Sequence, residues 1–198
     1  MKNKLRSIGK EAISLGVLAL LLFAARSSLA DHYEVPTGSM EYTMVPGDRI
    51  VVDKRAYGLR IPFTNWKLTD TPVSRGEVVI FDSPVEDVRL VKRVVAIAGD
   101  TVAVRGGRVS INGIYLHDRK EADVEVFGDR RIKLNLKYGG GPEMTPTPVP
   151  KGFVLTIGDA RGNSRDGRIF GMIEEDLIYG QALAVYYRSD DGFVWKGL

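Results

Sequence analysis

The chain has 198 residues, 44% of them hydrophobic and 27% charged, so it is long enough to bury a core and too apolar to be disordered. Its net charge of +3 is weak and lies largely in the first ten residues, which argues against a basic surface for nucleic acid. The absence of cysteine excludes disulfides, thiol nucleophiles and zinc–thiolate sites. The only histidines, His32 and His117, do not lie in segments suited to catalysis, so a metal hydrolase is nearly excluded as well.

The N-terminal segment joins four positive charges to an uncharged, mostly apolar run over residues 12–25. This length fits the core of a cleaved signal peptide better than a membrane span, which needs about 20 residues. Ser28-Leu29-Ala30 resembles the small-x-small site that follows such a core. Against cleavage, flanking basic residues can snorkel and residues 27–30 could extend the helix. In either case the charges predict a cytoplasmic N-terminus, with the chain from about Asp31 onward outside the cytoplasm.

From Asp31 onward, short β-type runs alternate with turn residues, so we predict a mainly β chain with antiparallel sheets. Helix signals are poor apart from a turn or two over residues 172–176. Asn112-Gly113 and Gly128-Asp129 lie at predicted hairpin turns. The predicted strands are 49–53, 77–81, 90–98, 101–105, 108–111, 114–116, 124–127, 132–136, 153–157 and 178–187.

The segment 102–150 holds the predicted hairpins and ends in a glycine-then-proline stretch, 139–150, that we expect to be an exposed connector. It carries none of the candidate chemistry, which lies on both sides of it. We therefore predict a cytoplasmic tip and membrane segment over 1–30, a core formed by 31–101 and 151–198, and a smaller β insertion over 102–150.

Ser39 is the candidate nucleophile. It lies in Pro36-Thr37-Gly38-Ser39-Met40, where proline stiffens the approach and Gly38 leaves room for a peptide backbone beside the hydroxyl. The plainer interpretation is ordinary turn chemistry, for which Thr-Gly-Ser is a common sequence.

Lys92 is the candidate base, because a serine can be activated by a neutral lysine instead of a histidine. It lies in the most apolar predicted strand, where Leu90, Val94 and Ala96 share its face. A lysine of ordinary pKa is neutral in only about one molecule in a few thousand at pH 7, and apolar burial raises that fraction. The plainer interpretation is an edge-strand lysine whose ammonium reaches water.

Four segments in series resemble those of type I signal peptidases, the Ser/Lys endopeptidases that remove leader sequences from exported proteins. They are Pro36–Met40 for the nucleophile, 47–54 for the next strand, 91–100 around the lysine, and 158–171. Without this resemblance, 158–171 would be interpreted as a solvated, salt-bridged loop. The N-terminal segment is also similar to the anchor of that family, which favours a retained membrane helix over a cleaved leader.

The resemblance implies that Ser39 is the nucleophile and Lys92 the general base, with the Ser39 amide and the Thr37 hydroxyl forming an oxyanion hole. It implies that Ser164 hydrogen-bonds and orients the Lys92 amine. Four charged residues would hold that wall as ion pairs: Arg93, Asp159, Asp166 and Arg168. Two shallow pockets for small substrate residues would be lined by Met40, Val51, Ile80 and Val94.

The resemblance thus implies a single-pass enzyme of the bacterial inner membrane that cleaves exported preproteins after Ala-x-Ala-like sites. Its expected partners are preproteins and membrane lipid, with no cofactor, metal or nucleic acid. Departures from the family pattern are Tyr42 in place of a proline, and Ala160, Gly162 and Gly167 in the last segment. Two rivals stay open. One is a secreted, non-catalytic β domain, and the other is a self-cleaving repressor-type peptidase, whose helix-turn-helix would have to occupy the place of the membrane segment.

Overall fold

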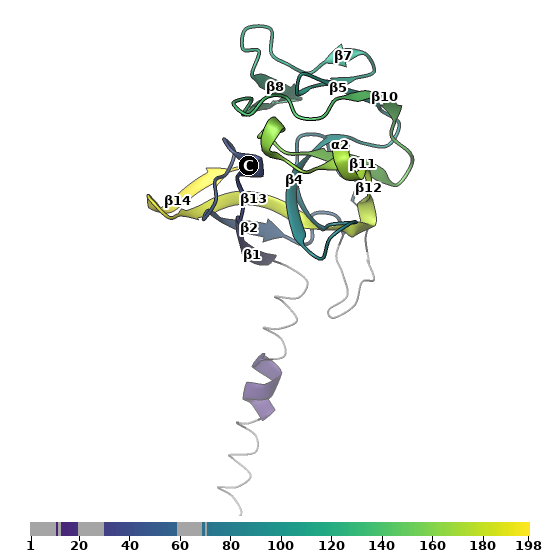
Figure 1. Cartoon of the computed structure of the whole chain (residues 1–198). Helices are drawn as coiled ribbons and strands as arrows, with labels where there is room; N and C mark the ends of the chain where they lie inside the picture. Colours follow the sequence, from purple (N-terminus) through teal and green to yellow (C-terminus); the bar gives the residue numbers. More distant parts are fainter. Residues whose placement is uncertain (1–10, 12, 20–29, 59–68, 70) are drawn as a thin grey trace, which may run out of the picture.

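The computed structural model describes residues 11, 13–19, 30–58, 69 and 71–198. These residues form a mainly β structure of antiparallel sheets, as predicted (Figure 1). The largest sheet has the strand order β1-β2-β13-β3-β4-β11-β12, and β14 pairs with β13 beside this path. Its strands are β1 (Ala30–Glu34), β2 (Arg49–Asp53), β3 (Val78–Asp82), β4 (Arg89–Ala96), β11 (Phe153–Ile157), β12 (Ile173–Glu174), β13 (Ile178–Arg188) and β14 (Gly192–Gly197).

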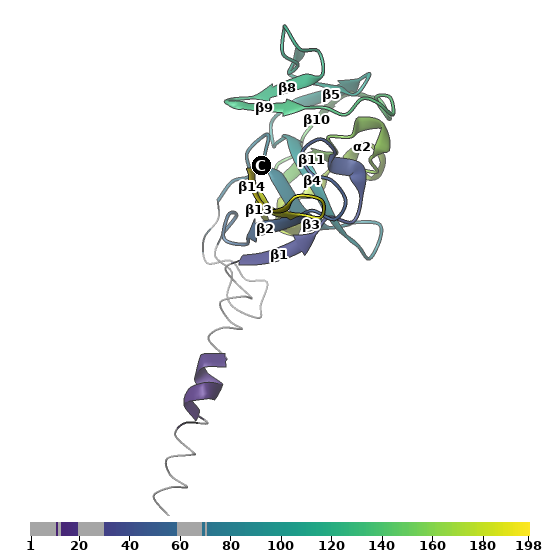
Figure 2. The same ribbon diagram turned by 90° about the vertical axis from the view of Figure 1, so that its left-hand side faces the viewer.

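A four-stranded sheet of order β10-β5-β6-β7 and a two-stranded sheet, β8-β9, are formed by the segment between β4 and β11. Both views place β8 at the end of the molecule opposite β1 (Figures 1 and 2). The strands are β5 (Thr101–Arg105), β6 (Arg108–Ile111), β7 (Ile114–Tyr115), β8 (Val124–Phe127), β9 (Arg130–Lys133) and β10 (Met144–Pro148). The predicted hairpins at Asn112-Gly113 and Gly128-Asp129 are therefore confirmed.

One apolar cluster joins the large sheet to the four-stranded sheet. It contains Val95 and Ala96 from β4, Val102 and Val104 from β5, Val109 and Ile111 from β6, and Leu155 and Ile157 from β11. Because these side chains bury one another across the two sheets, β4 and β11 are held from both sides. This matters for the site, since β4 carries Lys92 and β11 leads into the segment that begins at Gly158.

Helical segments are short. The α-helix α2 is Gly167–Phe170, and three 3-10 turns, η1, η2 and η3, are Gly38–Met40, Arg161–Asn163 and Glu175–Leu177. The prediction of helical turns at 172–176 matches only η3 and missed α2. The missed signal is Asp166, whose carboxylate accepts the Arg168 amide and so caps the helix.

The prediction of an exposed connector over 139–150 was wrong for residues 144–148. These form β10, which pairs with β5 through Met144 opposite Val104 and Thr147 opposite Val102. The two prolines of β10 are compatible with a strand because β10 lies at the edge of its sheet, where missing N–H donors face outward. Strands β1, β12 and β14 were missed as well.

Residues 13–19 are helical. No helix in the described ranges is both long and apolar enough to cross a membrane. The predicted membrane segment falls mostly on residues 1–10, 12 and 20–29, which lie outside the described residues. Ala30, to which the helix could have extended, begins β1 instead and pairs with Asp53 of β2.

Candidate active site

The serine lies on a tightly closed turn. Ser39 is in η1, and the amide of Met44 donates to the Met40 carbonyl at 2.9 Å, which closes the turn behind it. The Ser39 carbonyl accepts the Ala160 amide at 3.1 Å, so the turn is tied to the segment that follows β11. Met40 and Met44 are buried and anchor the turn in the apolar core. The Ser39 side chain is thereby fixed with 8% of the residue exposed.

Gly38 lies close to the carboxylate of Glu41. A Cβ at this position would lie 2.5 Å from Glu41 Oε1, closer than real Cβ contacts. Glu41 is itself held, because Asn135 Nδ2 donates to its Oε2 at 3.0 Å. A larger residue at position 38 would displace that carboxylate or the turn that carries Ser39.

Lys92 lies in the middle of β4, which is flanked by β3 and β11, so it is not an edge-strand lysine in water. The residue is 3% exposed, and its Nζ donates to Ser39 Oγ at 2.6 Å. Burial lowers the pKa of Lys92 to about 8, although Asp166 and Asp159 act in the opposite direction. The apolar strand predicted the burial of Lys92, and the family resemblance implied its proximity to Ser39.

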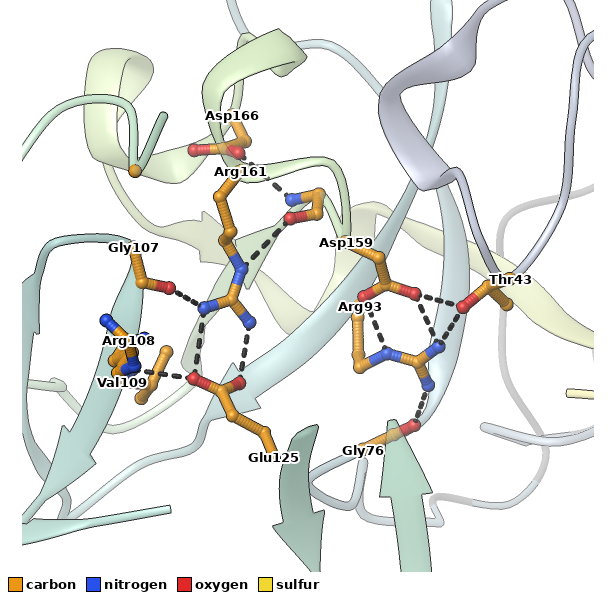
Figure 3. Close-up of polar contacts among 12 residues, drawn as sticks. Thr43, Gly76, Arg93, Gly107, Arg108, Val109, Glu125, Asp159, Arg161 and Asp166 are labelled. Carbon is orange, nitrogen blue, oxygen red and sulfur yellow. Dashed lines mark hydrogen bonds and ion pairs between the residues drawn. The ribbon is translucent and has the colours of Figure 1, made fainter. Parts of the chain in front are cut away.

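Arg93, next along β4, makes a buried ion pair with Asp159 (Figure 3). Its Nε and Nη2 donate to the two carboxylate oxygens at 2.9 and 2.7 Å. Its Nη1 donates to the Gly76 carbonyl at 2.6 Å, and Thr43 Oγ1 bonds both partners. Every charged atom of the pair thus has a partner, as burial of two charges requires.

Asp166 and Arg168 make a second buried pair. Arg168 Nε and Nη2 donate to Asp166 at 2.8 and 2.7 Å. The amide of Gly158 also donates to Asp166 at 2.9 Å (Figure 3). Burial alone would raise the pKa of Asp166, but Arg168 outweighs it and the pKa is lowered. The carboxylate is therefore charged near neutral pH and holds the start of the 158–168 segment.

Ser164 does not make the contact that its predicted role requires, whereas the role of Thr37 in an oxyanion hole stays a prediction. Ser164 Oγ is buried and meets no partner with hydrogen-bond geometry among the described residues, so the predicted bond to Lys92 is not formed. It lies close enough to the Asp166 carboxylate to lower the pKa of that acid. Thr37 Oγ1 lies 3.5 Å from Ser39 Oγ, at the limit of a hydrogen bond.

The four residues predicted to line the substrate pockets are not gathered in one place. Met40 and Ile80 are fully buried in one apolar cluster, and Val94 is fully buried in another. Val51 is half-buried on β2.

Two residues that sequence reasoning passed over connect the segment between β4 and β11 to the site. The carboxylate of Glu125, in β8, accepts hydrogen bonds from both terminal nitrogens of Arg161, at 3.0 and 2.6 Å (Figure 3). Burial would lower the pKa of Arg161, but Glu125 outweighs it and the pKa is raised. Asn135 donates its amide to the Asp159 carbonyl and accepts the Arg161 amide. A polar residue amid the apolar run of β8 was the only available signal for Glu125.

A buried serine hydroxyl bonded to a desolvated amine fits the class of serine peptidases that use lysine in place of histidine. Residues 8–187 match the family described as signal peptidase, peptidase S26. A signal peptidase I of Pseudomonas aeruginosa is 30% identical over 203 residues, which cover 86% of this chain and 69% of that protein. A signal peptidase I of Aquifex aeolicus is 27% identical over 225 residues, which cover 90% and 84%. The chain therefore belongs to the signal peptidase family S26 and is a peptidase.

A solved signal peptidase I from Enterococcus faecalis V583 is more distant. It is 24% identical, covers 57% of this chain and 98% of its own, and has a TM-score of 0.41. At that distance the likeness carries no argument about this chain.

Proposed function

We propose that the chain is a membrane-bound serine endopeptidase that removes signal peptides from exported preproteins by acyl transfer, with Ser39 as nucleophile and Lys92 as general base. Membership in family S26 supports the reaction class. The observation that carries the residue assignment is the 2.6 Å contact between Lys92 Nζ and Ser39 Oγ in a buried setting.

The first step is proton transfer from Ser39 to neutral Lys92 as Oγ attacks the scissile carbonyl. With a pKa of about 8, Lys92 is neutral in roughly one molecule in ten at pH 7, against about one in three thousand for an ordinary lysine. Burial therefore raises the active fraction by about two orders of magnitude. The contact already lies within the range needed for direct proton transfer.

The tetrahedral oxyanion is stabilised by the Ser39 amide and the Thr37 hydroxyl, each contributing about 3 kcal/mol to the transition state. Protonated Lys92 then gives its proton to the leaving amine. Water attacks the acyl-enzyme as Lys92 takes its proton and passes it to the departing Ser39 Oγ, which releases the signal peptide with a free carboxylate and restores the serine hydroxyl. The ion pairs of Arg93 with Asp159 and of Arg168 with Asp166 hold the wall around Lys92.

We also propose a retained membrane anchor within residues 1–30, with the N-terminus in the cytoplasm and the catalytic part outside the inner membrane. The basic N-terminal charges and the apolar run support this topology. Sharing a bilayer with the substrate raises its effective concentration. The catalytic part consists of 31–101 and 151–198, with 102–150 as an insertion that buttresses it. Cleavage follows small residues in Ala-x-Ala-like sites.

The test is cleavage of a preprotein in detergent by the wild type, Ser39→Ala, Lys92→Arg and the control Lys151→Arg. Arginine keeps the charge of lysine but cannot lose its proton. Ser39→Ala and Lys92→Arg should fold and lose cleavage, while Lys151→Arg, at an exposed position, should cleave as the wild type does. Substantial cleavage by folded Lys92→Arg would contradict the assignment of the base.

A further inference from the structure

A cavity of about 380 Å³ lies beside the turn that follows Ser39. Its walls come from that turn, from β4, from hairpin strand β9, and from the end of β14 with the residue after it. Five of the side chains that line it are basic: Arg93, Arg130, Arg131, Lys133 and Lys196. No aspartate or glutamate side chain is among the described residues of its lining, and its one carboxylate is the terminal group of Leu198, which makes no ion pair with a described residue.

Two of the basic groups are already neutralised by carboxylates outside the cavity. Arg93 is paired with Asp159. Arg131 is paired with Asp118 at an N–O distance of 2.5 Å and with Glu121 at 2.9 Å. These two side chains shape the cavity and contribute little free positive charge to it.

The other three basic groups are poorly compensated. Arg130 Nη1 is buried and has no hydrogen-bond partner in the described part of the chain. Lys133 reaches its nearest carboxylate, on Asp123, only at 3.9 Å. Lys196 donates to two backbone carbonyls, those of Tyr42 and Thr43, at 3.0 and 2.7 Å. A buried guanidinium nitrogen without an acceptor is costly, so the cavity favours an anion that would accept from it.

The pKa of Lys196 points the same way. It is lowered, first by burial and then by the positive charge of Arg188. The carboxylates of Asp48 and Asp159 oppose the shift without cancelling it. Burial is thus the main reason that the charged form of Lys196 is disfavoured, and an anion bound beside it would favour that form.

The cavity is within reach of a peptide held at Ser39. Tyr42, on its wall, follows Ser39 by three residues, so their Cα atoms are at most about 11 Å apart. An extended peptide advances about 3.4 Å per residue, and a glutamate side chain adds a few ångströms of reach. A residue two to four positions from the scissile bond can therefore place its carboxylate in the cavity.

A lipid headgroup is the less suitable occupant. One wall is formed by β9, which belongs to the hairpin at the end of the molecule opposite β1 (Figures 1 and 2). Strand β1 directly follows the N-terminal segment that we propose to lie in the membrane. The cavity is thus at the nucleophile turn and away from the side that would face the bilayer.

We propose that this cavity is an acidic-residue subsite, which binds the side-chain carboxylate of an aspartate or glutamate of the polypeptide substrate within four residues of the scissile bond. The proposal rests on the proposed function and adds to it a substrate preference. Arg130 and Lys133 are the residues that determine this preference, with Lys196 completing the cationic wall.

The experiment compares peptides that share a cleavable site and differ by glutamate or glutamine at one position within four residues of the scissile bond, leaving the two small residues unchanged. Binding is measured by fluorescence anisotropy in the Ser39→Ala background, and cleavage is measured with active Ser39. The subsite variant is Arg130→Gln with Lys133→Gln. The matched control is Arg119→Gln with Lys151→Gln, which removes the same charge at exposed positions outside the cavity.

At one position at least, the protein with an intact cavity and the control variant should prefer the glutamate peptide to the glutamine peptide by about tenfold in affinity and in kcat/KM. In the subsite variant this glutamate-to-glutamine ratio should fall to between about one and two. A ratio near one at every position, or the same loss in the control, would overturn the subsite while leaving the peptidase intact. Preferential binding without any cleavage would instead refute the proposed function and keep the subsite. The protein could instead bind vesicles of anionic lipid, lose that binding in the subsite variant, and show no preference between the peptides. This result would identify a lipid headgroup as the occupant and overturn the proposal.

Discussion

The buried amine of Lys92 should lower the free energy of unfolding of the protein. The substitution Lys92→Met tests this expectation. The pKa of Lys92 falls from 10.5 in the unfolded chain to about 8 in the folded one. The unfolded chain therefore binds the proton more tightly, and the free energy of unfolding is reduced by about 3 kcal/mol below pH 8. This penalty fades as the pH rises from about 8 toward 10.5, because both states then become neutral.

Methionine is close to lysine in length and carries no charge, so it can occupy the same apolar channel. It removes the bond to Ser39 Oγ, at a cost of about 1 kcal/mol. The net expectation is that Lys92→Met is about 2 kcal/mol more stable than the wild type at pH 7, with the charge-dependent part of the difference falling below about 1 kcal/mol at pH 10.

The assay is guanidinium unfolding of the detergent-solubilised protein at pH 7 and pH 10, followed by far-UV circular dichroism. Lys151→Met, at an exposed lysine, serves as control and should show no such pH-dependent gain. If Lys92→Met were less stable than the wild type at pH 7, or if the difference between them were independent of pH, burial of a disfavoured charge would be the wrong description of Lys92.

Three further outcomes follow. kcat/KM on a peptide substrate should rise about tenfold per pH unit up to about pH 8 and then level, because only neutral Lys92 accepts a proton. A flat profile between pH 6 and 8 would contradict the assignment of Lys92 as the base. Asp159→Ala leaves the buried Arg93 without its carboxylate and should lower the free energy of unfolding by about 3–5 kcal/mol, whereas a loss below 1 kcal/mol in chemical denaturation would show that the pair is solvated. Gly158→Ala puts a Cβ 2.5 Å from the Ser39 carbonyl oxygen and should reduce kcat at least tenfold in a protein that still folds; wild-type kcat would show that the turn can move freely.

Local patterns in the sequence were enough for most of the sheet. The runs that became β2, β3, β4, β11 and β13 contain many β-branched or aromatic residues, and the turn at Asn112-Gly113 requires the positive φ that Asn and Gly tolerate. Strand β10 was missed because its prolines and threonines suggest a linker. Only its pairing with β5 makes it a strand, and such pairing is invisible along the chain.

The sequence predicted which residues form the site. It did not predict most of the contacts among them. The burial of Lys92 followed from the apolar strand, but its pairing with Ser39, 53 residues away, came from the resemblance to a family. The contact of Glu125 with Arg161 joins two segments whose order in the sequence says nothing of their distance. For Ser164 the resemblance implied a contact that the structure does not contain. Its hydroxyl is buried and makes no hydrogen bond to Lys92.

The most direct test of the proposed chemistry is an NMR titration of the Lys92 side chain in protein labelled with ¹³C at lysine Cε, with assignment from Lys92→Arg. The expected result is a titration midpoint near pH 8 that moves when Ser39 is replaced by alanine. A midpoint near the ordinary lysine value of about 10.4, insensitive to Ser39, would show that the amine stays charged at neutral pH and cannot be the base.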